Sequence, residues 1–188
     1  MTTVAPPTLL HPDSIASMLA LAEATPRGAF VEVGVYRGGS AWHMAALARR
    51  QGRALHLFDT FTGIPECCER DRPHKVGDFG DASLEAVRAA VPDAVVHVGV
   101  FPATLPSDGI GLVAFVHVDC DQYQCARAAI ECLLPLMPAG GVMLFDDYGV
   151  TDGVTAAVDE AFLPREIKRT PQGKAFFVVE DRPDGMPL

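Results

Sequence analysis

Two pairs of aspartates stand at the ends of apolar segments of the chain, in the stretches HVDCDQY and FDDYG. They are Asp119, Asp121, Asp146 and Asp147. Carboxylates gathered at one place repel one another unless a cation neutralises them, and Mg²⁺ prefers oxygen ligands. The pattern predicts a divalent-cation site. A helix-capping role is the alternative for Asp121, which precedes a predicted helix.

Two more acids follow apolar segments nearer the N-terminus. Glu32 precedes the turn GVYRGGS, in which Gly34 and Gly38 allow tight bending and the close approach of a ligand. Asp59 ends the stretch LFD, at a position where an acid commonly binds ribose hydroxyls. A carboxylate beside the glycines disfavours a phosphate ligand. The two acids therefore predict a nucleoside ligand without phosphates, unless the glycine turn and Asp59 are structural features only.

The segments that must position these acids alternate between strand and helix patterns. Strands are expected at 29–33, 54–58, 95–98, 112–118, 142–145, 167–170 and 175–179, and helices at 14–23, 40–50, 83–90, 122–136 and 154–162. This alternation predicts an α/β fold with a doubly wound, Rossmann-like, seven-stranded and mostly parallel sheet. The turn at 171–173 is too short for a parallel crossover, so the last strand is expected to be antiparallel. In such sheets ligands lie beyond the carboxyl ends of the strands, where the acids stand.

Length and composition limit the classes of protein. The 188 residues are expected to form a single domain, 1–188, with a loosely ordered N-terminal arm at 1–12. The formal net charge of −9 disfavours nucleic acid as a partner, because phosphate backbones are repelled. The apolar runs are too short to cross a membrane, so no membrane partner is expected. The N-terminus lacks the pattern of a signal peptide and the cysteines show no CxxC spacing, so a cytoplasmic location is expected.

Several longer stretches carry a resemblance to a known family. They are VEVGVYRGGS, LFDTFTGIPE, VGVFPATLP and FVHVDCDQYQCARAAIECLLPLMPAGGVMLFDDYG, which together with the intervening segments span about 31–162. In this combination and order the chain resembles class I S-adenosylmethionine-dependent methyltransferases. Within them it is most similar to the macrocin O-methyltransferase (TylF-like) family of metal-dependent sugar O-methyltransferases.

The resemblance implies roles for individual residues. It implies that S-adenosylmethionine is bound by Glu32, Gly34, Gly38, Ser40, Asp59, Thr60, Phe61, Asp78 and Phe79. It implies that Mg²⁺ (or Mn²⁺) is held by Asp119, Asp146 and Asp147, and that Asp121 is the general base, acting in catalysis together with Asp119.

The reaction that the resemblance implies is metal-dependent transfer of a methyl group to a hydroxyl of a small molecule. A sugar or glycosylated natural product is the first candidate acceptor, and a catechol-type aromatic acceptor is the alternative. Two other classes stay open. One is a nicotinamide-dependent oxidoreductase, which the missing GxGxxG motif disfavours, and the other is a non-catalytic nucleoside- or metal-binding domain.

The chain departs from the family pattern at two places. The first sheet strand is expected near residue 29, so the helical section that usually precedes it is short, and Gln124 and Cys125 stand where an acid commonly follows the tyrosine. These differences bear on the acceptor and on assembly, for which a homodimer is one expectation. The irregular segment 62–79 is expected to shape the acceptor site, and His74 within it is a candidate for substrate contact.

Overall fold

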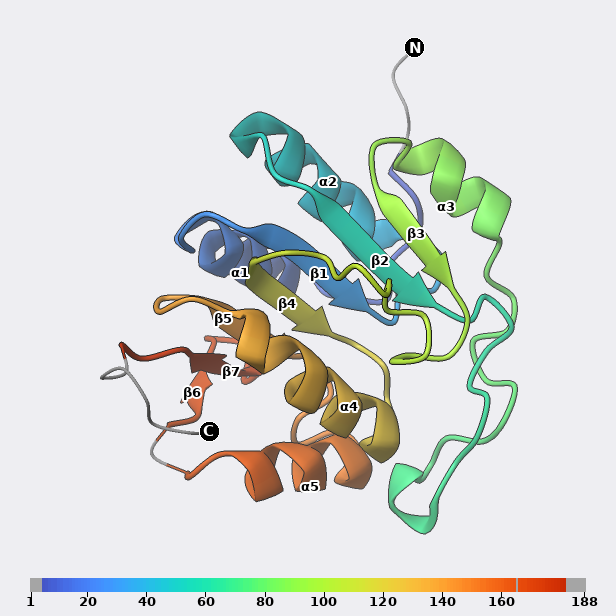
Figure 1. The fold of residues 1–188 in the computed structure, drawn as a ribbon. Helices are drawn as coiled ribbons and strands as arrows, with labels where there is room; N and C mark the ends of the chain where they lie inside the picture. The colour runs from blue at the N-terminus through green and yellow to red at the C-terminus, as the bar shows by residue number, and fades with distance from the viewer. Residues whose placement is uncertain (1–4, 165, 182–188) are drawn as a thin grey trace.

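The computed structural model describes residues 5–164 and 166–181, and its seven strands form one sheet (Figure 1). The strands are β1 (Ala29–Val33), β2 (Leu55–Asp59), β3 (Val95–Val98), β4 (Val113–Val118), β5 (Val142–Phe145), β6 (Lys168–Arg169) and β7 (Ala175–Val178). The α-helices are α1 (Pro12–Glu23), α2 (Gly39–Gln51), α3 (Leu84–Ala90), α4 (Tyr123–Leu133) and α5 (Asp152–Ala161). Two short 3₁₀ helices, η1 (Glu69–Asp71) and η2 (Leu134–Leu136), complete the described elements.

The strand order is β3-β2-β1-β4-β5-β7-β6. Strands β1 to β5 pair in parallel, whereas β7 runs antiparallel to both β5 and β6. A tight turn joins β6 to β7, in which the Gly173 amide donates to the Thr170 carbonyl at 2.9 Å. The predicted α/β, Rossmann-like sheet with an antiparallel last strand is therefore confirmed.

Helices cover both faces of the sheet (Figure 1). Alternate strand residues supply the two core clusters, so Phe30 packs towards α1, α2 and α3 while its neighbour Val31 packs towards α4 and α5. All six residues of β4 are buried, which explains why all of them except His117 are apolar. The order of strands places the carboxyl ends of β1 and β4 side by side at the centre of the sheet.

The ends of several elements differ from the sequence prediction, for local reasons. Helix α1 begins at Pro12, because proline suits a first helical position that needs no amide hydrogen bond. The predicted helix 122–136 is α-helical to Leu133 and continues as η2, which contains Pro135. Helix α5 begins at Asp152, two residues early, because the Thr151 hydroxyl caps the Val154 amide.

A long segment, residues 60–81, connects β2 to α3 and contains only η1 as regular structure. Its two limbs pair near the sheet, where the Ile64 amide donates to the Asp78 carbonyl and the Gly77 amide donates to the Ile64 carbonyl, each at 2.9 Å. Farther along, the buried Asp71 carboxylate accepts the amide of Tyr123, the first residue of α4, at 2.7 Å. The first two bonds close the segment on itself, and the third attaches it to the start of α4.

None of the helices within residues 5–164 and 166–181 has the length and apolar character needed to cross a membrane.

Candidate active site

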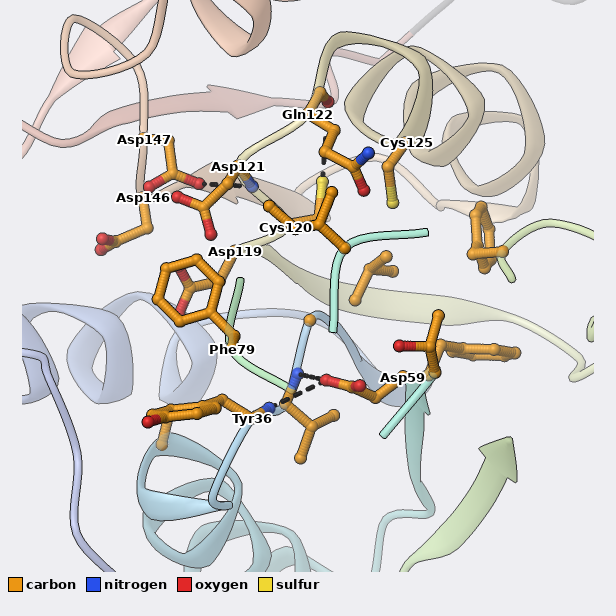
Figure 2. A pocket seen from close by; sticks show the side chains of 18 of the residues that line it. Tyr36, Asp59, Phe79, Asp119, Cys120, Asp121, Gln122, Cys125, Asp146 and Asp147 are labelled. Atoms are coloured by element: carbon orange, nitrogen blue, oxygen red, sulfur yellow. Dashed lines mark hydrogen bonds between the residues drawn. The ribbon is translucent and has the colours of Figure 1, made fainter. Parts of the chain in front are cut away.

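A cavity of about 810 Å³ lies at the carboxyl ends of β1, β2, β4 and β5. Of the residues expected to form the site, nine line it: Gly34, Ser40, Asp59, Thr60, Phe79, Asp119, Asp121, Asp146 and Asp147. Figure 2 shows Asp119, Asp121, Asp146 and Asp147 gathered on one side of the cavity and Asp59 on the other. A volume of this size is typical of small-molecule sites.

The turn after β1 passes directly over the chain that leaves β4. At Gly34 φ is +89°, and a Cβ atom there would overlap the carbonyl oxygen of Asp119. Gly39, at the start of α2, lies against Pro7 and Thr8 of the segment that precedes α1, with no room for a side chain. The two glycines therefore let the turn after β1, the chain that leaves β4 and the segment before α1 meet at one wall of the cavity.

Asp59, at the end of β2, organises this turn. One carboxylate oxygen accepts the amides of Val35 at 2.7 Å and Tyr36 at 2.9 Å, and the other accepts the amide of Phe61 at 2.7 Å. These bonds give Asp59 the turn-forming role that was the alternative to ribose binding. The carboxylate still lines the cavity, so it retains acceptor capacity towards a ligand.

Three acids form a cluster suited to a cation. One carboxylate oxygen from each of Asp119, Asp146 and Asp147 lies within 4.8 Å of the other two. Burial, and then the neighbouring carboxylates, raise the pKa of Asp119 well above its usual value. The same causes raise the pKa of Asp147 to about 7. Raised pKa values mean that the folded chain holds these carboxylates together at a cost, which a bound cation would offset.

Asp121 lies beside this cluster with an unusual backbone. Its φ is +60°, a left-handed conformation that is rare for a residue other than glycine. Its amide donates to the Asp147 carboxylate at 3.1 Å. Burial raises the pKa of Asp121 to about 6. The residue does not cap α4, whose first amide is bound by Asp71, so the capping alternative is wrong.

Lys174, from the turn between β6 and β7, also reaches the acids. Its ammonium donates to a carboxylate oxygen of Asp146 at 2.6 Å and to the backbone carbonyl of the same residue at 2.8 Å. It offsets one of the negative charges of the cluster. Sequence analysis missed this residue, because its arrival at Asp146 depends on the position of β7 beside β5 and not on any local motif.

Glu32 lies beneath the cavity and is not part of its lining. It is fully buried, and its carboxylate meets Nδ1 of His117 on β4 at 2.9 Å. Burial alone would lower the pKa of His117, but the hydrogen bond and charge of Glu32, together with the charges of Asp146 and Asp147, outweigh it and raise this pKa. Within the described residues, Glu32 Oε2 and His117 Nε2 have no hydrogen-bond partner.

Of the remaining residues predicted to bind the cofactor, some line the cavity and others lie outside its lining. Phe79 lines the cavity and packs edge-on against Tyr36, with ring centroids 5.5 Å apart. Thr60 lines it too, and its hydroxyl donates to the Gly63 carbonyl at 2.7 Å. Gly38, Phe61 and Asp78 do not line it: Gly38 is the N-cap of α2, Phe61 is buried in the core, and Asp78 accepts the Lys75 amide.

Two thiols are also part of the cavity lining. Cys120 and Cys125 both line the cavity and lie near each other (Figure 2). A hydrogen bond with Cys125, together with burial, raises the pKa of the Cys120 thiol. Among the described residues no disulfide is formed.

Comparisons with known proteins follow the same lines. The family model described as Macrocin-O-methyltransferase (TylF) matches residues 15–171. An 8-demethyl-8-(2,3-dimethoxy-alpha-L-rhamnosyl)-tetracenomycin-C 4'-O-methyltransferase of Streptomyces olivaceus is 35% identical over 147 residues, which are 69% of this chain and 56% of that protein. A demethyldecarbamoylnovobiocin O-methyltransferase of Streptomyces niveus is 31% identical over 150 residues, 71% of this chain and 57% of that protein. The chain thus spans little more than half the length of these relatives.

The fold is also shared with solved structures. The structure of the O-methyltransferase NovP superposes with a TM-score of 0.82 at 24% identity, covering 93% of this chain and 82% of that one. Similarity at this level supports a common arrangement of strands and helices.

Proposed function

The chain belongs to the macrocin O-methyltransferase family, and we propose that it transfers a methyl group from S-adenosylmethionine to a hydroxyl of a sugar-bearing small molecule. The observation that carries the proposal is the meeting of the glycine turn and four carboxylates in one cavity. Both curated relatives are named as O-methyltransferases, and the name of the Streptomyces olivaceus protein contains a rhamnosyl group, which supports this class of acceptor. Assembly as a homodimer and a cytoplasmic location stay predictions from the sequence.

The wall built by β1 and β2 suits a cofactor that presents a nucleoside and an amino acid. Gly34 and Gly39 line the cavity and let its wall pack closely against Asp119 and Thr8, and Asp59 presents a carboxylate to it. Phe79 and Tyr36 add aromatic surface at the same wall. Glu32 acts from below, by fixing β1 against β4 through His117.

The acid cluster suits a hard divalent cation. Asp119, Asp146 and Asp147 offer only oxygen ligands, and the cost of burying them together is the kind that a cation removes. When bound, the cation supplies Lewis acidity that lowers the pKa of a hydroxyl, and S-adenosylmethionine supplies a methyl group on a sulfonium centre. Metal dependence is accordingly part of the proposal.

Asp121 is placed to take the proton of the acceptor hydroxyl. Its carboxylate faces the cavity next to the cluster, and its pKa of about 6 suits a base that works near neutral pH. The bond from its amide to Asp147 ties the base to a cation ligand, so the two are positioned as one unit.

The first test is calorimetric titration of S-adenosylhomocysteine into chelator-treated protein, repeated with Mg²⁺. We expect micromolar binding of S-adenosylhomocysteine, followed by turnover with sugar-bearing acceptors and little with catechols. Asp146→Asn should abolish metal-dependent turnover and leave S-adenosylhomocysteine affinity largely intact. Absence of binding with and without Mg²⁺ would overturn the methyltransferase proposal, and full activity in excess chelator would overturn the role of the metal.

A further inference from the structure

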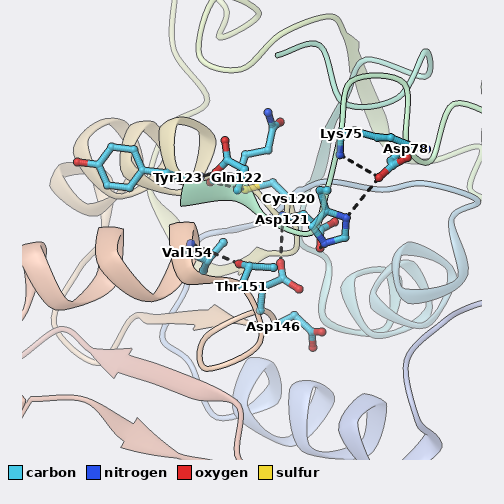
Figure 3. A network of polar contacts seen from close by, with 12 residues as sticks. Lys75, Asp78, Cys120, Asp121, Gln122, Tyr123, Asp146, Thr151 and Val154 are labelled. Carbon is cyan, nitrogen blue, oxygen red and sulfur yellow. Dashed lines mark hydrogen bonds and ion pairs between the residues drawn. The ribbon is translucent and has the colours of Figure 1, made fainter. Parts of the chain in front are cut away.

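His74, in the middle of segment 60–81, reaches the carboxylate of Asp121. Its Nε2 lies 3.2 Å from Asp121 Oδ1, and its Nδ1 lies 3.7 Å from Asp78 Oδ2. Both His74 and Asp121 side chains are 18% exposed, so water screens the contact only in part. Figure 3 shows Asp78 next to Lys75, whose amide donates to the Asp78 carboxylate at 3.0 Å. His74 does not line the cavity, so its contact with Asp121 lies outside the cavity lining.

The position of the His74 ring is fixed by its own segment. Its backbone amide donates to the Asp71 carbonyl at 2.9 Å, and its ring packs against Phe79 with centroids 5.5 Å apart. Asp71 is in turn held by the amide of Tyr123 in α4. The ring therefore reaches Asp121 only while the segment is seated on α4.

Asp121 is a residue that needs such support. Its left-handed backbone is strained, and a single rotation about its Cα–Cβ bond would turn the carboxylate away from the cavity. With Asp121 ionised, a proton on His74 Nε2 would let this 3.2 Å contact act as a hydrogen bond to Oδ1, because a carboxylate only accepts.

We propose that His74 is a positioning residue: its Nε2–H holds Asp121 Oδ1, so that the base is in place only when segment 60–81 is seated. The inference rests on the proposed function in giving Asp121 the role of base. It adds that the position of this base depends on segment 60–81, which supplies none of the proposed cation ligands.

The first experiment compares His74→Leu with His74→Gln. Leucine removes the donor, whereas glutamine keeps an N–H at a similar reach without a titrating ring. We expect kcat to fall about 10–100-fold in His74→Leu, the range for loss of a supporting hydrogen bond at an active site, with an unchanged dissociation constant for S-adenosylhomocysteine. His74→Gln should recover most of the kcat. The control is His43→Leu, a half-buried histidine of α2 outside the cavity.

Wild-type kcat in His74→Leu would overturn the inference. Equal loss in the leucine and glutamine variants would also overturn it, since the ring would then be moving a proton and not positioning a carboxylate.

A second experiment measures the contact without turnover. Amide hydrogen exchange in residues 66–79 should rise in His74→Leu and in Asp121→Asn, and the double variant should show no further rise. Independent, additive effects would overturn the inference even in an active enzyme. Coupled exchange in a protein that methylates no acceptor would instead overturn the proposed function and leave the His74–Asp121 contact in place.

Discussion

At Gly34 the chain turns with φ of +89°, and its Cα faces the carbonyl oxygen of Asp119 at a distance that admits no side chain. The turn proposed to hold the cofactor and the first proposed cation ligand therefore touch through backbone atoms alone. A change at this residue moves both halves of the site together.

Gly34→Ala tests this contact. Alanine adds the cost of a positive φ and an overlap with Asp119, and we expect a loss of about 2–4 kcal/mol in the free energy of unfolding and no measurable S-adenosylhomocysteine binding. The matched control is Gly52→Ala, where φ is +64° but no atom lies within 4 Å of the added methyl. That variant should lose only about 1 kcal/mol, and similar losses in urea unfolding for the two variants would contradict the steric explanation.

Between the elements, the decisive contact is the one that joins segment 60–81 to the helical layer. Asp71 is 1% exposed and accepts two amides, from Cys68 and from Tyr123 at the start of α4, each at 2.7 Å. A carboxylate at a helix N-terminus is also favoured by the helix dipole. Gly153 of α5 leaves room for this carboxylate, because a Cβ atom there would lie 2.5 Å from it.

Asp71→Ala should release the segment and destabilise the protein. Two amides lose their acceptor, the buried one of Tyr123 and the partly buried one of Cys68, for an expected cost of about 2–4 kcal/mol. Proteolysis within 66–74 should become faster, while the sheet amides stay protected from hydrogen exchange. Asp93→Ala, which removes an exposed ion pair with Arg49, is the control and should change stability by less than about 0.5 kcal/mol. Unchanged proteolysis in Asp71→Ala would show that other contacts hold the segment.

At the scale of the whole molecule, stability should depend on pH through a pair of histidines on adjacent strands. His56 Nδ1 and His97 Nε2 are 3.0 Å apart, and His97 stacks on Phe58 with ring centroids 4.3 Å apart. Burial lowers the pKa of both histidines, and for His56 the charge of His97 lowers it further. The two facing nitrogens share one proton, so a second proton breaks their hydrogen bond.

The sign of the effect follows from these lowered pKa values. The unfolded state binds protons first as pH falls through the ordinary histidine value of about 6.5, so the stabilisation is present above that pH and is lost below it. The double variant His56→Gln/His97→Gln should therefore lose less stability than wild type between about pH 7.5 and 5, as measured by urea unfolding. Parallel curves for the two proteins would exclude the pair as the source.

The architecture of the whole chain could be predicted because its signals are local. The bounds of β1, β3 and β5 match the expected strands, and the antiparallel β7 follows from one short turn. The acids come together as expected, since the carboxyl ends of neighbouring parallel strands meet at one edge.

The parts of the site that could not be predicted depend on partners across the structure. The sequence shows Glu32 before a glycine turn, but only pairing of β1 with β4 places His117 against it. Asp59 accepts backbone amides of a turn whose shape is not specified by any pattern in the sequence. Lys174 and His74 arrive from connecting segments, whose paths are determined by tertiary contacts.

The seating of segment 60–81 has a practical consequence for its thiols. Cys68, beside Asp71, is exposed, whereas burial raises the pKa of its neighbour Cys67 and of Cys132, and Cys120 is also held protonated by its surroundings. Thiol reagents attack the thiolate, so a maleimide fluorophore added at neutral pH should label Cys68 ahead of these three. The natural sequence thus carries its own attachment point for a probe, and the emission of that probe would report, without any engineered cysteine, when the segment leaves α4.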